Sequence, residues 1–215
     1  MTMRAGKVVG LVAAGLMVLA LAACYLPNKF MSEIRLGRTG DFALSFKGEL
    51  VWAPLYREIR QGHLSAAELA GKLEEIRTDL VRDKRFSKVE SLGDGRFQVE
   101  YEREGHLGDS EQVTFVRRNA IILMIRGTPN GLITISGNTL KPSDSQAATG
   151  MGLDIEGEFR IVTDGLVKEH NATMVKPFGP YRVYIWKIQN AFSPSPHFVM
   201  QREGVWPSKS QEPKK

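Results

Sequence analysis

Four histidines are the first residues to examine for chemistry, because imidazole serves both as a metal ligand and as a general acid or base. They are His63, His106, His170 and His197, which lie far apart in the 215-residue chain. No two of them have the H-x-H or H-E-x-x-H spacing that brings two imidazoles to one metal ion. The single cysteine, Cys24, cannot form a cysteine-only metal site. We therefore expect no metal site and no cofactor.

Nucleophilic and nucleotide-binding motifs are also missing from the sequence. The chain has neither G-x-S-x-G nor S-x-x-K, the motifs that present an activated serine. Gly150, Gly152 and Gly157 do not have the spacing of a dinucleotide fingerprint or a P-loop. The sequence thus predicts no catalytic residues and favours a non-enzymatic protein.

Two groups of carboxylates leave an alternative open. Glu100, Glu102 and Glu104 alternate along one segment and could bind a cation, although such alternation is typical of a solvated strand face. A hydrolase-type site could also converge from separate strands, and for it we consider His170 with Glu158 and Asp164. Such a site requires two of these groups to lie within about 3 Å of each other in a pocket.

The N-terminal segment has the layout of a secretory signal peptide. Arg4 and Lys7 precede an apolar stretch at residues 8–23, and Cys24 follows at once. As a helix, this stretch would span about 24 Å, which is short of the roughly 30 Å hydrocarbon core of a bilayer. A cleaved signal therefore explains the segment better than a permanent transmembrane helix.

The residues around Cys24 add a modification to this prediction. Leu21-Ala22-Ala23-Cys24 resembles the lipobox of bacterial lipoproteins, in which the cysteine thiol receives a diacylglycerol and the signal is cleaved before it. The resemblance implies lipidation at Cys24. It also implies a protein of the bacterial cell envelope, held at the membrane by its N-terminal lipid anchor. Because Tyr25 rather than Asp follows the cysteine, similarity to enterobacterial sorting favours the outer membrane, facing the periplasm.

Composition and charge agree with an ordinary globular domain. The formal net charge is +5, from 29 basic and 24 acidic residues, and the charges are dispersed along the chain. This balance gives no reason to expect a nucleic-acid partner. An envelope protein or a lipid is the expected partner. Asn171-Ala172-Thr173 matches an N-glycosylation acceptor, but we do not expect glycosylation there, because the lipobox is of the bacterial type.

The first half of the mature chain is expected to form a hairpin and two helices. Alternating residues at 31–36 and 42–46 flank a turn, and Pro54 is suited to the first position of a short helix. Ser65 and Glu68 have capping-box spacing, so a second helix should start near Ser65. Leu69, Leu73, Ile76 and Leu80 form an apolar stripe on that helix, which predicts a face packed on the core.

From residue 86 onward the period is two, which indicates strands. Short turns between them, at Asp94-Gly95, Asn130-Gly131 and Asp164-Gly165, predict hairpins with antiparallel pairing. The expected fold is therefore α+β: a twisted antiparallel sheet or open barrel of about ten strands, with a consecutive helical pair after the second strand. The polar connection at residues 137–152 is the exception, since its composition opposes a strand and predicts an exposed loop.

Three segments of the C-terminal half carry a family resemblance. They are Gly157-Glu158-Phe159-Arg160-Ile161, His170-Asn171-Ala172 and Tyr184-Ile185-Trp186-Lys187-Ile188. Their order is similar to that of the LppM-like bacterial lipoproteins. The resemblance implies an envelope-exposed α+β domain without a catalytic motif, and in one branch an interaction with phospholipid headgroups.

The chain is thereby divided into four parts. Residues 1–23 are the signal peptide, 24–30 a lipid-anchored tether, 31–204 a single α+β domain, and 205–215 a flexible tail.

Overall fold

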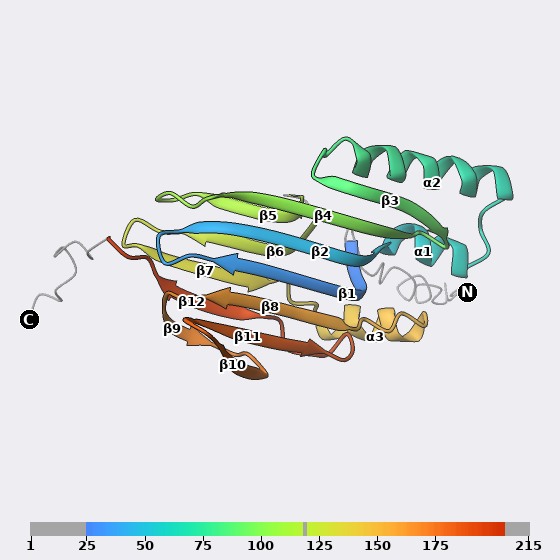
Figure 1. Ribbon diagram of the computed structural model, residues 1–215. Helices are drawn as coiled ribbons and strands as arrows, with labels where there is room; N and C mark the ends of the chain where they lie inside the picture. Colours follow the sequence, from blue (N-terminus) through green and yellow to red (C-terminus); the bar gives the residue numbers. More distant parts are fainter. Residues whose placement is uncertain (1–24, 118–119, 205–215) are drawn as a thin grey trace, which may run out of the picture.

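Two β-sheets face each other along the length of the domain (Figure 1). This computed structural model describes residues 25–117 and 120–204, so Cys24, the signal segment and the tail lie outside the described residues. The sheets do not close into a barrel, and the described residues form twelve strands and three helices.

The larger sheet has seven strands. Their order is β10 (Met174–Phe178), β11 (Tyr181–Ile188), β8 (Gly157–Thr163), β1 (Tyr25–Leu36), β2 (Asp41–Trp52), β4 (Arg96–His106) and β3 (Phe86–Gly93). The smaller sheet has five, in the order β5 (Gln112–Arg117), β6 (Ala120–Gly127), β7 (Leu132–Gly137), β12 (His197–Gln201) and β9 (Leu166–His170).

The main core lies between the sheets and is rich in aromatic rings. Phe46 of the larger sheet meets Phe115 of the smaller one, with ring centroids 4.8 Å apart. Tyr101 also lies 4.8 Å from Phe115, and both rings are almost completely buried. Burial of such rings from both inner faces joins the two sheets into one structural unit.

The predicted hairpins at residues 31–46 and at Asp94-Gly95 are present, whereas the hairpin expected at Asp164-Gly165 does not form, because β8 and β9 belong to different sheets. β1 and β2 pair antiparallel through all of residues 31–36, and β3 pairs with β4 across the Asp94-Gly95 turn. Asp94 and Gly95 both have positive φ, as a tight hairpin turn requires.

The expected single sheet or open barrel of about ten strands was wrong, because the described residues form two open sheets of seven and five strands. Two further expectations about the strands also failed. Not all pairs are antiparallel, because β1 and β8 pair parallel, from Phe30 opposite Gly157 to Leu36 opposite Thr163. These strands are separated by about half the chain, so the rule for short connections does not apply to them. The edge strand β10 was not predicted, since Pro177 interrupts its pattern; proline is tolerated at a sheet edge.

The two helices α1 (Ala53–Arg60) and α2 (Ala66–Val81) follow β2 along the chain. The Ser65 capping box is confirmed, because the Ser65 hydroxyl accepts from the Glu68 amide and the Glu68 carboxylate accepts from the Ser65 amide. Of the apolar stripe, only Leu80 is fully buried, while Leu73 and Ile76 are partly buried against the core. The helix lies beside the edge strand β3 (Figure 1), so its stripe has the core on one side and solvent on the other.

The long polar connection is not the unstructured loop that its composition predicted. Residues Pro142–Gly150 form a third helix, α3, with Pro142 in its first turn. Its buried residues are small, Ser145 and Ala148, so the helix packs without large apolar side chains. It lies at the end of the sheets where β1 begins (Figure 1).

The beginning of β1 also differs from expectation. Residues 25–30, for which a tether was expected, form the first half of the strand, and Tyr25 and Leu26 are buried. A β-bulge at residues 29–30, where Lys29 has positive φ, shifts the alternation along the strand. Residue 24 is therefore bonded directly to a buried strand residue.

Candidate functional site

An apolar cavity opens between the sheets at the end where β1 begins. Its volume is about 260 Å³, close to the lower end of the roughly 300–1,000 Å³ typical of small-molecule sites. We call it the anchor-end cavity. The residues that line it are Tyr25, Leu26, Pro27, Phe30, Ser32, Phe46, Phe115, Ile121, Ile122, Leu123, Gly137, Asn138, Thr139, Leu140, Pro142, Ser145, Ile155, Phe159, Ile188 and residues 190–196.

The lining contains no charged side chain. It includes no Asp, Glu, Lys, Arg or His, and its single titratable group is the phenol of Tyr25. Burial raises the pKa of Tyr25 to about 12, so this group is neutral at physiological pH. The cavity is thus suited to an uncharged apolar ligand, because any buried charge would lack a partner.

Phe30 forms one wall of the cavity and is held by two glycines. Its ring stacks on Phe46 with centroids 5.6 Å apart. A Cβ on Gly157 would lie 2.3 Å from Phe30 Cδ1 and 2.6 Å from the Phe30 carbonyl oxygen. A Cβ on Gly48 would lie 2.6 Å from Phe30 Cα. The close approach of the neighbouring strands therefore requires glycine at both positions.

Helix α3 and residues 190–196 cover another side of the cavity. The Ser145 hydroxyl donates to the Ala191 carbonyl at 2.8 Å, and the Ser195 hydroxyl donates to the Asn138 carbonyl at 3.0 Å. Phe192 lines the cavity, yet 56% of its surface is exposed. Its ring marks the side on which the cavity meets solvent.

Asn171, which follows the last residue of β9, holds residues 190–196 in place through hydrogen bonds. Its side-chain oxygen accepts from the indole Nε1 of Trp186 and from the His197 amide, both at 2.7 Å. Its Nδ2 donates to the Ser195 carbonyl at 2.9 Å. One side chain thus joins β11, β12 and the segment beside the cavity. The sequence drew attention to Asn171 only through short patterns that gave no reason for this role.

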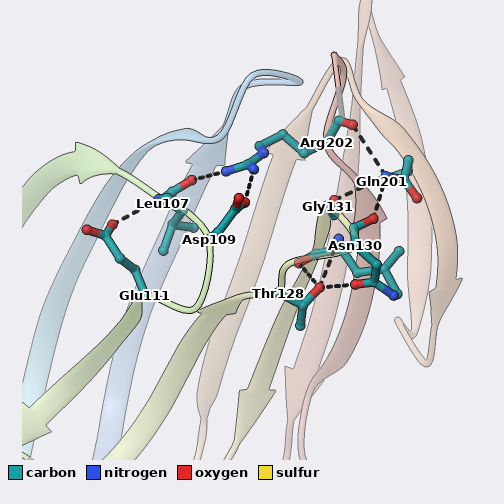
Figure 2. Close-up of polar contacts among 10 residues, drawn as sticks. Leu107, Asp109, Glu111, Thr128, Asn130, Gly131, Gln201 and Arg202 are labelled. Atoms are coloured by element: carbon teal, nitrogen blue, oxygen red, sulfur yellow. Dashed lines mark hydrogen bonds and ion pairs between the residues drawn. The ribbon is translucent and has the colours of Figure 1, made fainter. Parts of the chain in front are cut away.

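The opposite end of the domain is closed by a polar network around Arg202 (Figure 2). Arg202 is only 9% exposed; its Nη1 donates to the Leu107 carbonyl at 2.6 Å and its Nη2 pairs with Asp109. The Arg202 amide donates to the Gly131 carbonyl at 2.7 Å. The network joins the β4–β5 connection, the β6–β7 turn and the end of β12, and it is a structural closure rather than an open site. It was not predicted, because Arg202 reads as the last residue of a strand.

The histidines lie apart and contact different neighbours. His106 Nδ1 is 2.9 Å from Asp41 Oδ1, and His197 Nε2 is 3.3 Å from Glu169 Oε1. His63 is exposed in the α1–α2 connection. Within residues 25–117 and 120–204, no three His, Cys, Asp or Glu side chains form a group that could hold a metal ion.

The three residues considered for a hydrolase are not brought together. Asp164 accepts from Arg38 Nε at 3.0 Å, Glu158 pairs with Arg160, and His170 Nδ1 accepts from the Ala172 amide at 3.2 Å. No hydrogen bond or ion pair of the described residues joins two of the three. The separated contacts leave this group without the geometry of an acid–base site.

The carboxylates of β4 are on a solvent-facing surface, as their alternation predicted. Glu102 and Glu104 are exposed, and Glu100 pairs with Lys47 of β2 at 2.8 Å. The hydrogen bond from Lys47, and after it the positive charge of Lys47, lowers the pKa of Glu100. The three residues therefore belong to a charged sheet face.

The lipidation site predicted at Cys24 lies outside the described residues. Among the described residues, no helix is long and apolar enough to cross a membrane.

No protein-family model and no curated protein matches this sequence. Among solved structures, the domain is similar to the folded domain of Mycobacterium tuberculosis LppM, determined by NMR. The TM-score is 0.36 and the sequence identity 10%, over 93% of this chain and 100% of that domain. A likeness at this level supports no argument about the function of this chain.

Proposed function

We propose that this chain is a lipid-anchored protein of the bacterial cell envelope, acylated at Cys24, that binds an apolar chain and catalyses no reaction. The observation that carries the proposal is the uncharged lining of the anchor-end cavity. Burying apolar surface in such a cavity is favourable by roughly 25 cal/mol per Å². The cavity volume of about 260 Å³ suits one thin chain rather than a bulky molecule.

Binding is better supported than catalysis by the groups present at the cavity. General acid–base catalysis requires a group whose pKa is near the working pH. The titratable group in the lining is Tyr25, whose pKa of about 12 keeps it protonated. The alternative hydrolase residues, His170, Glu158 and Asp164, are each paired elsewhere and do not line this cavity.

The anchor and the location rest on the sequence around Cys24. The lipobox favours acylation there, and Tyr25 at the next position favours the outer membrane, facing the periplasm. To test the anchor, Cys24→Ala should be compared with wild type by intact mass and by fractionation after a salt wash. We expect the variant to lose the acyl mass and the mature N-terminus. Unchanged mass and membrane association would overturn the anchor.

Apolar-chain binding can be tested by photocrosslinking in living cells. We would replace Phe192 at the cavity by p-benzoylphenylalanine, which reacts with nearby aliphatic C–H bonds. The matched control is Phe178, whose ring is 67% exposed at the other end of the domain. An acyl-containing product is expected from position 192 and not from position 178.

A second substitution distinguishes cavity binding from mere proximity to the bilayer. Ile121→Trp adds bulk to the cavity lining, whereas Met124→Trp enlarges a half-buried residue of the same strand outside the lining. The acyl-containing product should be lost in Ile121→Trp and retained in Met124→Trp. Its persistence in a folded Ile121→Trp protein would refute binding in the cavity.

A further inference from the structure

The first residues of the described chain are themselves part of the cavity wall. Tyr25, Leu26 and Pro27 line the anchor-end cavity. Consecutive Cα atoms are 3.8 Å apart, so residue 24 is attached within one residue of that wall. A group carried by the side chain of residue 24 thus starts next to the cavity, without a spacer that would hold it away.

The electrostatics of the lining discriminate between two sources of an acyl chain. A free phospholipid brings a charged headgroup, whose phosphate is held best by a basic side chain where the tail enters, whereas the polar side chains of this lining, such as Asn138 and Ser193, are uncharged. The lining offers no Lys, Arg or His for this purpose. The acyl chains of a lipoprotein anchor are linked through glycerol to the cysteine sulfur, and therefore carry no charged headgroup.

We propose that the anchor-end cavity holds one acyl chain of the protein's own anchor at Cys24. This inference rests on the proposed function, because it requires acylation at Cys24. Entry of a tethered chain is an intramolecular event, and a short tether gives it a high effective concentration. The cavity volume of about 260 Å³ leaves room for no more than one chain, so the remaining chains of the anchor would stay in the bilayer.

Housing one chain is compatible with stable attachment to the membrane. A single acyl chain gives only marginal binding, whereas two signals anchor a protein stably. The lipobox resemblance also implies acylation of the new amino terminus, and such a triacylated anchor would retain two chains in the bilayer when the third is enclosed. The enclosed chain would hold the domain against the membrane at the end where β1 begins, with the Arg202 network at the far end.

The experiment uses the full-length protein in cells fed with a fatty acid that carries a diazirine at its methyl end. After irradiation, the purified protein is digested and the lipopeptide beginning at Cys24 is identified by mass spectrometry. We expect this lipopeptide to be joined, through its acyl chain, to peptides that contain residues 121–123 or 190–196. Ile121→Trp should lower this intramolecular product at least tenfold, and Met124→Trp should leave it unchanged.

Each outcome decides between the two proposals. A labelled anchor joined only to phospholipid places its chains in the bilayer and overturns the inference. If a phospholipid is joined to residues 121–123 instead, the inference fails while binding of an apolar chain is supported. An unmodified Cys24 overturns the anchor and the inference together. Should Ile121→Trp fail to fold, as judged by its thermal transition, Ala191→Phe adds bulk at another lining residue and should give the same loss.

Discussion

The two ends of the domain are closed by different physical means. At the anchor end, the sheets are separated by a cavity whose lining carries no charge, and its cover is held by serine hydroxyls and by Asn171. At the opposite end, the buried guanidinium of Arg202 bonds the Leu107 carbonyl and Asp109 of the β4–β5 connection, and the Arg202 backbone amide bonds the Gly131 carbonyl of the β6–β7 turn (Figure 2). An end that must stay fixed can use a charged network, whereas a site for an apolar chain must avoid one.

The largest effect on stability should come from Arg202→Ala. The substitution removes charge-assisted hydrogen bonds and leaves the buried Leu107 carbonyl without its partner, so we expect a loss of about 3 kcal/mol. Denaturation with urea would measure it. Arg38→Ala is the control, since this half-exposed arginine pairs with Asp164 and Glu203 and should cost less than about 1 kcal/mol. Equal losses in the two variants would mean that the burial of Arg202 does not increase the contribution of its hydrogen bonds to stability.

At the anchor end, Asn171→Ala should cost about 2 kcal/mol. The variant leaves the indole N–H of Trp186, a buried residue, without an acceptor. Asn171→Asp keeps an acceptor for Trp186 and for the His197 amide but loses the donor to Ser195, so its loss should be smaller. Thermal denaturation of both variants checks the order. A larger loss in Asn171→Asp would assign the stabilisation to the donated bond.

Gly157→Ala tests the wall of the cavity and should cost about 1.5 kcal/mol. The new methyl group would meet both the ring and the carbonyl oxygen of Phe30, so a backbone strand must shift. Gly150→Ala is the matched control, because a Cβ there has nothing within 4 Å. Within helix α3, that change should be neutral or slightly stabilising. If both variants were equally stable, the close approach of β8 to Phe30 would be refuted.

The local signals in the sequence predicted the local structure well. Ser65 and Glu68 determine the start of α2 by their own hydrogen bonds, and Asp94-Gly95 determines a turn by its positive φ angles. The capping box and the turn each involve only a few consecutive residues, so both can be predicted directly from the sequence. Helix α3 was missed because it packs through Ser145 and Ala148, whose small side chains give no apolar periodicity.

The cavity depends on relations that no local pattern contains. Gly157 meets Phe30 only because β8 pairs parallel with β1, and that pairing joins distant parts of the chain. The Asp164-Gly165 turn connects strands of different sheets, which its sequence does not distinguish from a hairpin. Predicting the candidate site therefore requires the order of strands in both sheets. The acylation of Cys24 remains a prediction from the sequence.

The smallest effect should appear in acid, and it concerns Asp41 at the beginning of β2. A hydrogen bond from Thr39, followed by one with His106, lowers the pKa of Asp41 below its usual value of 3.8. The Asp41 carboxylate binds a proton less readily in the folded state than in the unfolded state. Its hydrogen bonds with Thr39 and His106 therefore stabilise the folded protein above about pH 4. That contribution is lost as the pH falls through the lowered pKa.

Thr39→Val should raise the Asp41 pKa toward 3.8, since it removes the larger of the two hydrogen bonds while leaving His106 in place. An NMR titration of the carboxyl group measures the shift directly. In urea denaturation, Asp41→Asn should reduce the fall in stability between pH 5 and pH 2.5, whereas Gly157→Ala should lower stability equally at every pH. The cavity lining has no carboxylate to titrate. If Gly157→Ala changed the fall in stability between pH 5 and pH 2.5, the anchor end and the Asp41 end of the domain would therefore be coupled.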